Sequence, residues 1–224
     1  MGSIFTADFD CQYIAQQSDV VVVSLNYRYL FHLILKVVLT TKCKCRLGPL
    51  GWLHGSADQY PGNWGLHDII LALRFVQENI AAFGGNPHDV TVFGESAGSM
   101  ALGAVLLTTK IHSNNGSTQA ALFKRVILQS GSPTAVTEPF SEALKKTVNL
   151  AVRVNCSVEQ GPKVMMDCLK GKTFQELAVP LIGDLNRNEY FTPVYGDELL
   201  PRSTVELVKA AKVKVDVMVK QCGL

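Results

Sequence analysis

Two patterns of apolar and polar positions alternate along the chain. Residues 19–25 form a nearly continuous β-branched run, which is typical of a strand buried on both faces of a parallel sheet. Residues 67–83 predict a helix instead, because apolar side chains recur there at spacings of three and four: Ile69, Ile70, Leu73, Val76 and Ile80. The Gly-Gly-Asn-Pro segment at 84–87 predicts where this helix stops.

The same alternation continues to the end of the chain. Short apolar runs predict strands at residues 90–93, 126–128 and 213–219. Helical spacing predicts helices at 97–108, 141–154, 164–169 and 203–211. Strands that alternate with helices indicate an α/β fold with a mostly parallel central sheet and helices on both faces.

Composition narrows the class of protein. The chain has 224 residues, of which 47% are hydrophobic and 18% charged, and a formal net charge of +2. This balance excludes disorder and gives no reason to expect a nucleic acid partner. The longest apolar run, residues 30–39, is far shorter than the ~20 residues needed to span a bilayer, so no transmembrane helix is predicted. The first residues do not match a signal peptide.

One motif carries chemistry. The sequence Gly94-Glu95-Ser96-Ala97-Gly98 fits G-x-S-x-G between a predicted buried strand and a predicted helix, which is the context of a nucleophile elbow. Glycine at both flanking positions allows a turn that lifts the serine hydroxyl clear of the sheet. The helix N-terminus favours developing negative charge, and the Ala97 N–H is a candidate oxyanion donor. The alternative is a glycine-rich turn with an idle serine.

Several further segments resemble one family, the type-B carboxylesterases of the α/β-hydrolase superfamily, which includes cholinesterases and the non-catalytic neuroligins. The resemblance lies in residues 26–28, 47–51, 62–68, 76–87, 90–98, 127–132 and 191–201. It implies hydrolysis of small carboxylic esters through an acyl-enzyme on Ser96, without a cofactor or a metal. A neuroligin-like adhesion role is the alternative, although such proteins typically lack this serine.

The other members of a catalytic triad are not evident. In α/β-hydrolases an acid and then a histidine follow the serine. His112 is the only histidine after Ser96, and no acid lies between them. The resemblance places the acid after the strand at 213–219 and a glycine-rich oxyanion loop before Gly2. We therefore expect a partial domain, incomplete at both ends and inactive alone. His112 is expected in a surface loop, and His67 at a helix start.

Cysteines and glycosylation sequons bear on the compartment. The resemblance implies a disulfide between Cys156 and Cys168, with two buried thiols as the alternative. Asn115 and Asn155 each begin an N-x-S sequon. Together with the family's usual secretory route, these features predict an extracellular or lumenal parent protein. The sequence does not indicate an oligomeric state.

Residues 29–46 interrupt the resemblance. Removing these 18 residues joins Asn-Tyr-Arg directly to Leu-Gly-Pro-Leu-Gly, as in the family. The segment contains four basic residues and no acids, so without it the chain has 17 basic and 19 acidic residues. We interpret it as a translated intron or gene-model error. A genuine surface insertion, or a metal site at Cys43 and Cys45, is the alternative.

Amplification of the transcript across codons 28–47 tests this interpretation. We expect mature messenger RNA that lacks the 18 codons, because their removal restores the family's continuous segment. A mature transcript that retains them would make residues 29–46 a genuine insertion.

Overall fold

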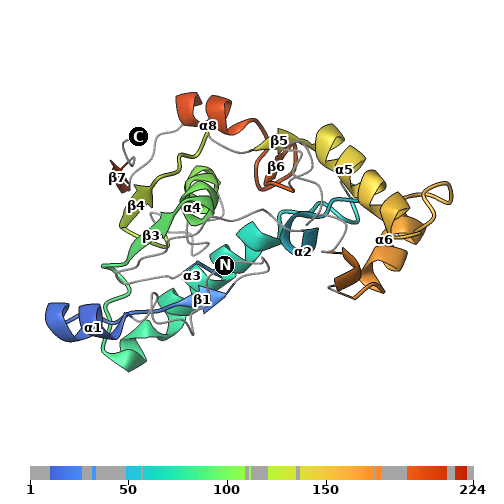
Figure 1. Ribbon diagram of the computed structural model, residues 1–224. Helices are drawn as coiled ribbons and strands as arrows, with labels where there is room; N and C mark the ends of the chain where they lie inside the picture. The colour runs from blue at the N-terminus through green and yellow to red at the C-terminus, as the bar shows by residue number, and fades with distance from the viewer. Residues whose placement is uncertain are drawn as a thin grey trace.

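The computed structural model describes most of the chain and is drawn in Figure 1. The described residues are 11–26, 32–33, 49–56, 58–108, 111, 121–134, 137–173, 175–177, 191–210 and 215–220. His112, Asn115 and all of 29–46 except His32 and Leu33 lie outside them.

A three-stranded parallel sheet confirms the predicted α/β class. Its strands are β3 (Thr91–Glu95), β4 (Arg125–Gln129) and β7 (Asp216–Lys220), in the order β3-β4-β7. All three match predicted strands within three residues. The sheet is in register at its carboxyl edge, where Glu95 pairs with Gln129 and Gln129 pairs with Lys220.

Helix α4 (Ala97–Leu107) packs directly on β3 and β4 (Figure 1). Nine of its eleven residues are buried, because small side chains allow neighbouring elements to approach on several sides. Helix α3 (Trp64–Asn79) packs beside it and continues as the 3₁₀ helix η2 (Ile80–Phe83). The five apolar positions that predicted this helix are all buried, and Gly84 ends it with a φ of 80°.

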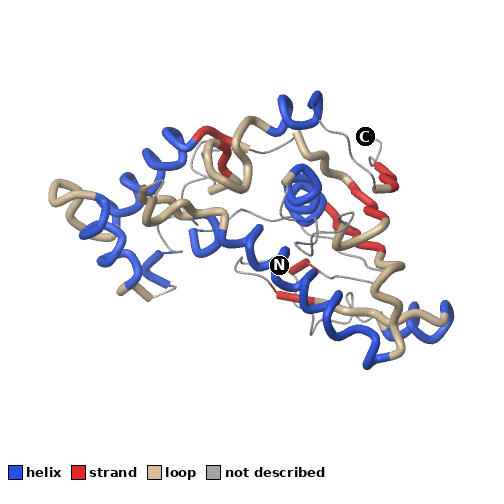
Figure 2. Tube along the Cα trace, turned by 180° about the vertical axis from the view of Figure 1, so that it is seen from behind, coloured by secondary structure: helices blue, strands red, loops and turns tan. Residues whose placement is uncertain are grey.

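A second group of elements lies on the far side of α4 from the sheet, as Figures 1 and 2 both show. It contains α5 (Phe140–Arg153), α6 (Pro162–Lys170) and a short parallel pair, β5 (Glu138–Pro139) and β6 (Val194–Tyr195). The structure contains the expected disulfide between Cys156 and Cys168. Closing a loop of this length stabilises a fold by about 3 kcal/mol in the chain-entropy model. Helix α8 (Thr204–Ala210) contacts α4.

The prediction for residues 19–25 is wrong in both extent and pairing. Only β1 (Leu25–Asn26) is a strand, and it pairs antiparallel with β2 (His32–Leu33). Helix α1 (Gln12–Ser18) precedes it, and α2 (Pro49–Trp52) begins the next described segment. Val21, Val22 and Val23 are partly buried against the core. A β-branched run indicates burial, and here the valines pack against the core, while no parallel ladder joins them to another of the described residues.

Buried Asn63 joins the start of α3 to β6. Its amide nitrogen donates to the Val194 carbonyl and to an Asp197 carboxylate oxygen, both at 2.8 Å, and its amide oxygen accepts from the Val194 N–H at 2.9 Å. Asn63 has a φ of 55°, a left-handed conformation that asparagine tolerates better than most residues. One polar side chain thereby links two segments more than 130 positions apart.

Beside this link, the imidazole of His54 is fully buried. Its Nδ1 lies 2.6 Å from the Trp52 carbonyl oxygen, and its ring meets that of Phe140 edge-on at 6.0 Å. Gly62 leaves room for the ring, since a Cβ at that position would lie 2.1 Å from Nε2. Burial lowers the pKa of His54 from 6.5 to about 4, against the opposing effects of the Trp52 carbonyl and the Asp197 carboxylate.

We expect acid to destabilise the fold through His54. The unfolded chain binds a proton below pH 6.5, whereas the folded chain does so only near pH 4, so stability falls as the pH falls between these values. Between pH 7 and pH 5 the free energy of unfolding should fall by about 2 kcal/mol from this group. Urea denaturation at both pH values measures the change.

His54→Leu should remove this part of the pH dependence. His88→Gln, at an exposed position, is the matched control and should retain it. An identical fall in His54→Leu and in the unaltered chain would contradict the assignment.

Candidate active site

Ser96 occupies the turn between β3 and α4 in a strained backbone conformation. Its φ is 56° and its ψ is −121°, a combination that residues other than glycine rarely adopt. Such a conformation costs of the order of 1–3 kcal/mol and persists only where the surroundings impose it. The sharp turn predicted from the G-x-S-x-G motif is therefore present at Ser96.

The turn depends on a close approach between Gly94 and Gly98. A Cβ at position 94 would lie 2.6 Å from the carbonyl carbon of Gly98 and 2.8 Å from the backbone nitrogen of Ser99. These neighbours are backbone atoms, so no rotamer change could relieve the contact. The last strand residues and the first helical turn can meet this closely only with glycine at position 94.

Backbone hydrogen bonds hold Ser96 while its hydroxyl remains outside the helix cap. The Ser96 N–H donates to the Gln129 carbonyl at 2.9 Å, and the Ser96 carbonyl accepts from the Met100 N–H at 3.0 Å. The Ser96 side chain makes no capping bond to α4. The N–H of Ala97, the first residue of α4, has no acceptor within the helix. Such an N–H at a helix N-terminus can stabilise an anion.

The loop after β4 packs against this turn and is hydrogen-bonded to it. The Ser99 hydroxyl donates to the Gly131 carbonyl at 2.8 Å, and a Cβ on Gly131 would lie 2.7 Å from the Ser96 carbonyl oxygen. Ser130 has a φ of 51°, and its N–H donates to the Lys220 carbonyl at 2.8 Å. The positioning role of Ser99 and Gly131 was not predicted from the sequence. The available signal was the Ser-Gly pair at 130–131, shortly after the strand predicted at 126–128.

Ser96 therefore lies at the carboxyl edge of the parallel strands. Glu95, Gln129 and Lys220 end the three strands in register. Ligands of α/β proteins generally bind outside this edge. The arrangement places a serine hydroxyl on a sharp turn, with a helix N-terminus beside it and adjacent strand ends from which other groups could approach.

Three histidines whose side chains the structure describes occupy other positions. His54 is buried against Phe140, and His88 is exposed in the loop before β3. His67 lies exposed in the first turn of α3, with its ring 6.1 Å from that of Trp64. None of these three histidines donates to or accepts from Ser96. The site as described is a strained serine turn that none of these three histidines contacts.

Comparison with known proteins gives the family. The sequence model of the Carboxylesterase family matches residues 1–221. The chain is 40% identical to the acetylcholinesterase of Danio rerio over 180 residues, which are 79% of this chain and 24% of that protein. It is 38% identical to the cholinesterase of Mus musculus over 221 residues, or 92% of this chain and 32% of that protein. It is also 35% identical to neuroligin-3 of Mus musculus over 192 residues, or 86% of this chain and 20% of that protein.

A sharp serine turn between a strand and a helix, at the carboxyl edge of a parallel sheet, is the arrangement of the α/β-hydrolase class. Within that class, the chain belongs to the carboxylesterase family. It spans about a quarter to a third of the length of the two cholinesterases named above.

The structure also bears on the Asn155 sequon and on the search for a membrane-spanning helix. Asn155 is exposed, with a φ of 57°, and directly precedes Cys156 of the disulfide. Among the described residues, no helix is both long and apolar enough to cross a membrane.

Gly94→Ala should disrupt the turn at Ser96. The added methyl group meets fixed backbone atoms of Gly98 and Ser99, and relief requires β3 and α4 to separate. We expect the free energy of unfolding to fall by about 3 kcal/mol, the upper range for overpacking. Chemical denaturation measures this loss.

Gly171→Ala is the matched control. Its φ is −76°, and a Cβ there would have no neighbour closer than 3.4 Å. Stability should change by less than ~1 kcal/mol in this variant. Equal effects of the two substitutions would show that the approach of Gly94 to Gly98 does not constrain the fold.

Proposed function

We propose that the protein from which this chain comes hydrolyses small carboxylic esters, with Ser96 as the nucleophile. The observation that carries the proposal is the strained Ser96 backbone between β3 and α4. Proteins keep such strain mainly where function requires it. Membership of the carboxylesterase family supports the same reaction.

The proposed reaction proceeds in two steps through an acyl-enzyme. The Ser96 oxygen attacks the ester carbonyl as a base removes the hydroxyl proton, and the tetrahedral intermediate then releases the alcohol. The Ala97 N–H donates to the oxyanion, assisted by the helix N-terminus. Water, activated by the same base, next attacks the acyl group, releases the acid and regenerates Ser96. Gly94, Glu95 and Gly98 build the turn, and the reaction requires no cofactor or metal.

The base and its orienting acid are proposed to come from a longer parent protein. His112 is the only histidine after Ser96 in the 224 residues, and no acid lies between the two. The usual order of an acid followed by a histidine is therefore absent. The 224 residues alone should therefore react slowly. A general base contributes roughly 10²–10⁴-fold to such steps.

A non-catalytic adhesion protein is the rival proposal. The similarity to neuroligin-3 favours it. The intact motif around Ser96 and the strain held in its backbone favour the hydrolase, because an adhesion surface gains nothing from a positioned hydroxyl at a helix N-terminus.

We further propose an extracellular or lumenal location for the parent protein. A disulfide persists in an oxidising compartment, and the structure contains the Cys156–Cys168 bond. The exposed side of Asn155 is accessible to a glycan, and Asn115 begins the second candidate sequon. Both features are typical of secreted proteins.

A fluorophosphonate probe tests the nucleophile. We expect the 224-residue chain to be labelled about 10³-fold more slowly than a version extended with the downstream coding sequence, because only the latter would supply a base. In the extended version Ser96→Ala should abolish labelling. Ser141→Ala, at an exposed serine of α5, is the control and should leave labelling unchanged.

The outcomes separate the parts of the proposal. Fast labelling of the 224-residue chain that is lost in Ser96→Ala would show that this chain contains its own base. An extended version that is never labelled, or is labelled equally in Ser96→Ala, would exclude Ser96 as the nucleophile and favour the adhesion role.

A further inference from the structure

A pocket of about 450 Å³ lies between the start of α3 and helix α6. In Figures 1 and 2, α6 lies on the opposite side of α4 from the sheet, so this pocket is separate from the Ser96 turn. Its volume is within the range of small-molecule sites in proteins. The lining residues are Leu53, Gln59, Tyr60, Trp64, Met166, Leu169, Lys170, Lys172 and Leu177.

The pocket is mainly apolar inside. Met166, Leu169 and Leu177 are buried, and Leu53 and the Trp64 indole are partly buried. A ligand that displaces water from these surfaces gains about 25 cal/mol for each Å² of apolar area covered. This lining suits a hydrocarbon chain or an aromatic ring and gives a fully hydrated ion no advantage.

Lys170 provides one positive charge at the rim. Its ammonium lies 4.2 Å from the centre of the Tyr60 ring and 4.0 Å from Asp167 Oδ1, which is too far for a strong hydrogen bond. Asp167 is already engaged, since its Oδ2 accepts from Lys163 at 2.6 Å and its Oδ1 from the Tyr60 hydroxyl at 3.3 Å. Lys170 therefore retains donors for another anion.

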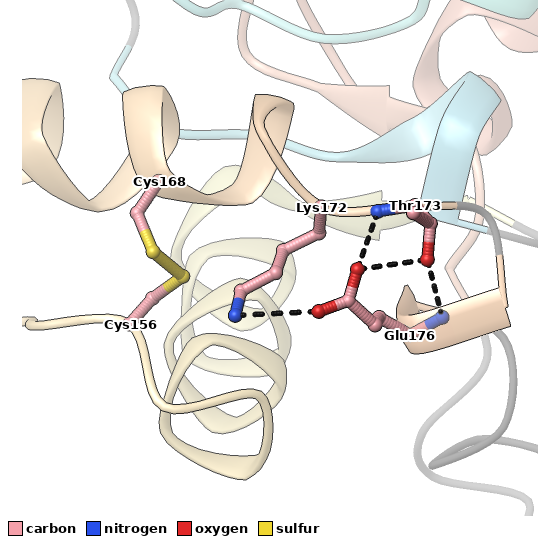
Figure 3. Close-up of a disulfide and its surroundings, with 5 residues drawn as sticks. All are labelled: Cys156, Cys168, Lys172, Thr173 and Glu176. Carbon is pink, nitrogen blue, oxygen red and sulfur yellow. Dashed lines mark hydrogen bonds and ion pairs between the residues drawn. A yellow bond between two sulfur atoms is a disulfide. The ribbon is translucent and has the colours of Figure 1, made fainter.

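Lys172 provides the second charge and is held in a similar way (Figure 3). Its ammonium lies 3.6 Å from Glu176 Oε1. The other carboxylate oxygen of Glu176 accepts from both the N–H and the hydroxyl of Thr173 at 2.7 Å. Because Thr173 fixes Glu176, the weak ion pair positions Lys172 without exhausting its three donors.

The disulfide holds this rim in place. Cys168 directly precedes Leu169 and Lys170 in α6, and its bond to Cys156 ties the helix to the segment after α5 (Figure 3). This link restrains the α6 side of the pocket, which reduces the entropy lost when a ligand orders these residues.

We propose that this pocket binds a small apolar monocarboxylate. The hydrocarbon part lies against Trp64, Met166 and Leu169, and the carboxylate accepts hydrogen bonds from Lys170 and Lys172. An apolar cavity bordered by two incompletely engaged ammonium groups is complementary to an apolar body with one negative end. The proposal is independent of the chemistry at Ser96.

Titration of the 224-residue chain with sodium octanoate tests the proposal, with octanamide as the uncharged match. The probe is methyl NMR of the five methionines, because Met166 lines the pocket and Met100 follows Ser96 by one helical turn. We expect saturable shifts at Met166 and none at Met100. Octanamide should bind about tenfold more weakly, since it lacks charge-assisted hydrogen bonds.

Variants separate the charges from the cavity. Lys170→Gln combined with Lys172→Gln should weaken octanoate binding at least tenfold and leave octanamide binding unchanged. Lys145→Gln, at an exposed lysine of α5, should change neither. No saturable shift at Met166, equal affinity for the two ligands, or unaltered octanoate binding in the double variant would each overturn the proposal. Shifts at Met100 alone would assign the ligand to the Ser96 turn and also overturn it.

Discussion

The close approach of β3 to α4 at Gly94 is the constraint on which the described fold depends. Gly94, one residue before the end of β3, lies against the backbone of Gly98 and Ser99, so the chain must turn sharply at Ser96. Ser96 takes the resulting strain, and the small residues of α4 let the helix lie on β3 and β4 with nearly all of its surface covered. The stability gained from this packing offsets the unfavourable serine conformation. Larger side chains in α4 would move the helix outwards and release the strain.

The same approach organises the neighbouring strand ends. Gly131 fits beneath the Ser96 carbonyl, and Ser99 fastens α4 to that loop. Ser130 in turn donates to Lys220 at the end of β7. Three strands far apart in sequence therefore end at one place through short backbone contacts, and a reacting group on any of them would have a fixed position relative to Ser96.

The sequence predicted those elements in which the spacing of apolar residues or glycines reflects local packing. The spacing of Ile69, Leu73 and Val76 predicted α3, and the flanking glycines predicted the turn at Ser96. The valines at 21–23 led to the incorrect prediction of a parallel strand, because burial alone does not specify a strand partner. Links such as Asn63 to Val194 could not be predicted, since a single asparagine carries no sign of a partner 131 positions away. The pocket at α6 could not be predicted for the same reason, because its lining residues come from segments that only the fold brings together.

Strand β7 has a further consequence for how this chain behaves in solution. Within the described residues it pairs only with β4, and its side chains Val217, Met218 and Val219 are 46%, 61% and 60% exposed. An edge strand with three consecutive exposed apolar residues is a template for pairing with another molecule. Aspartate and lysine at its two ends act as gatekeepers but leave the centre uncovered. Self-association through this strand is therefore expected to increase with the concentration of the chain.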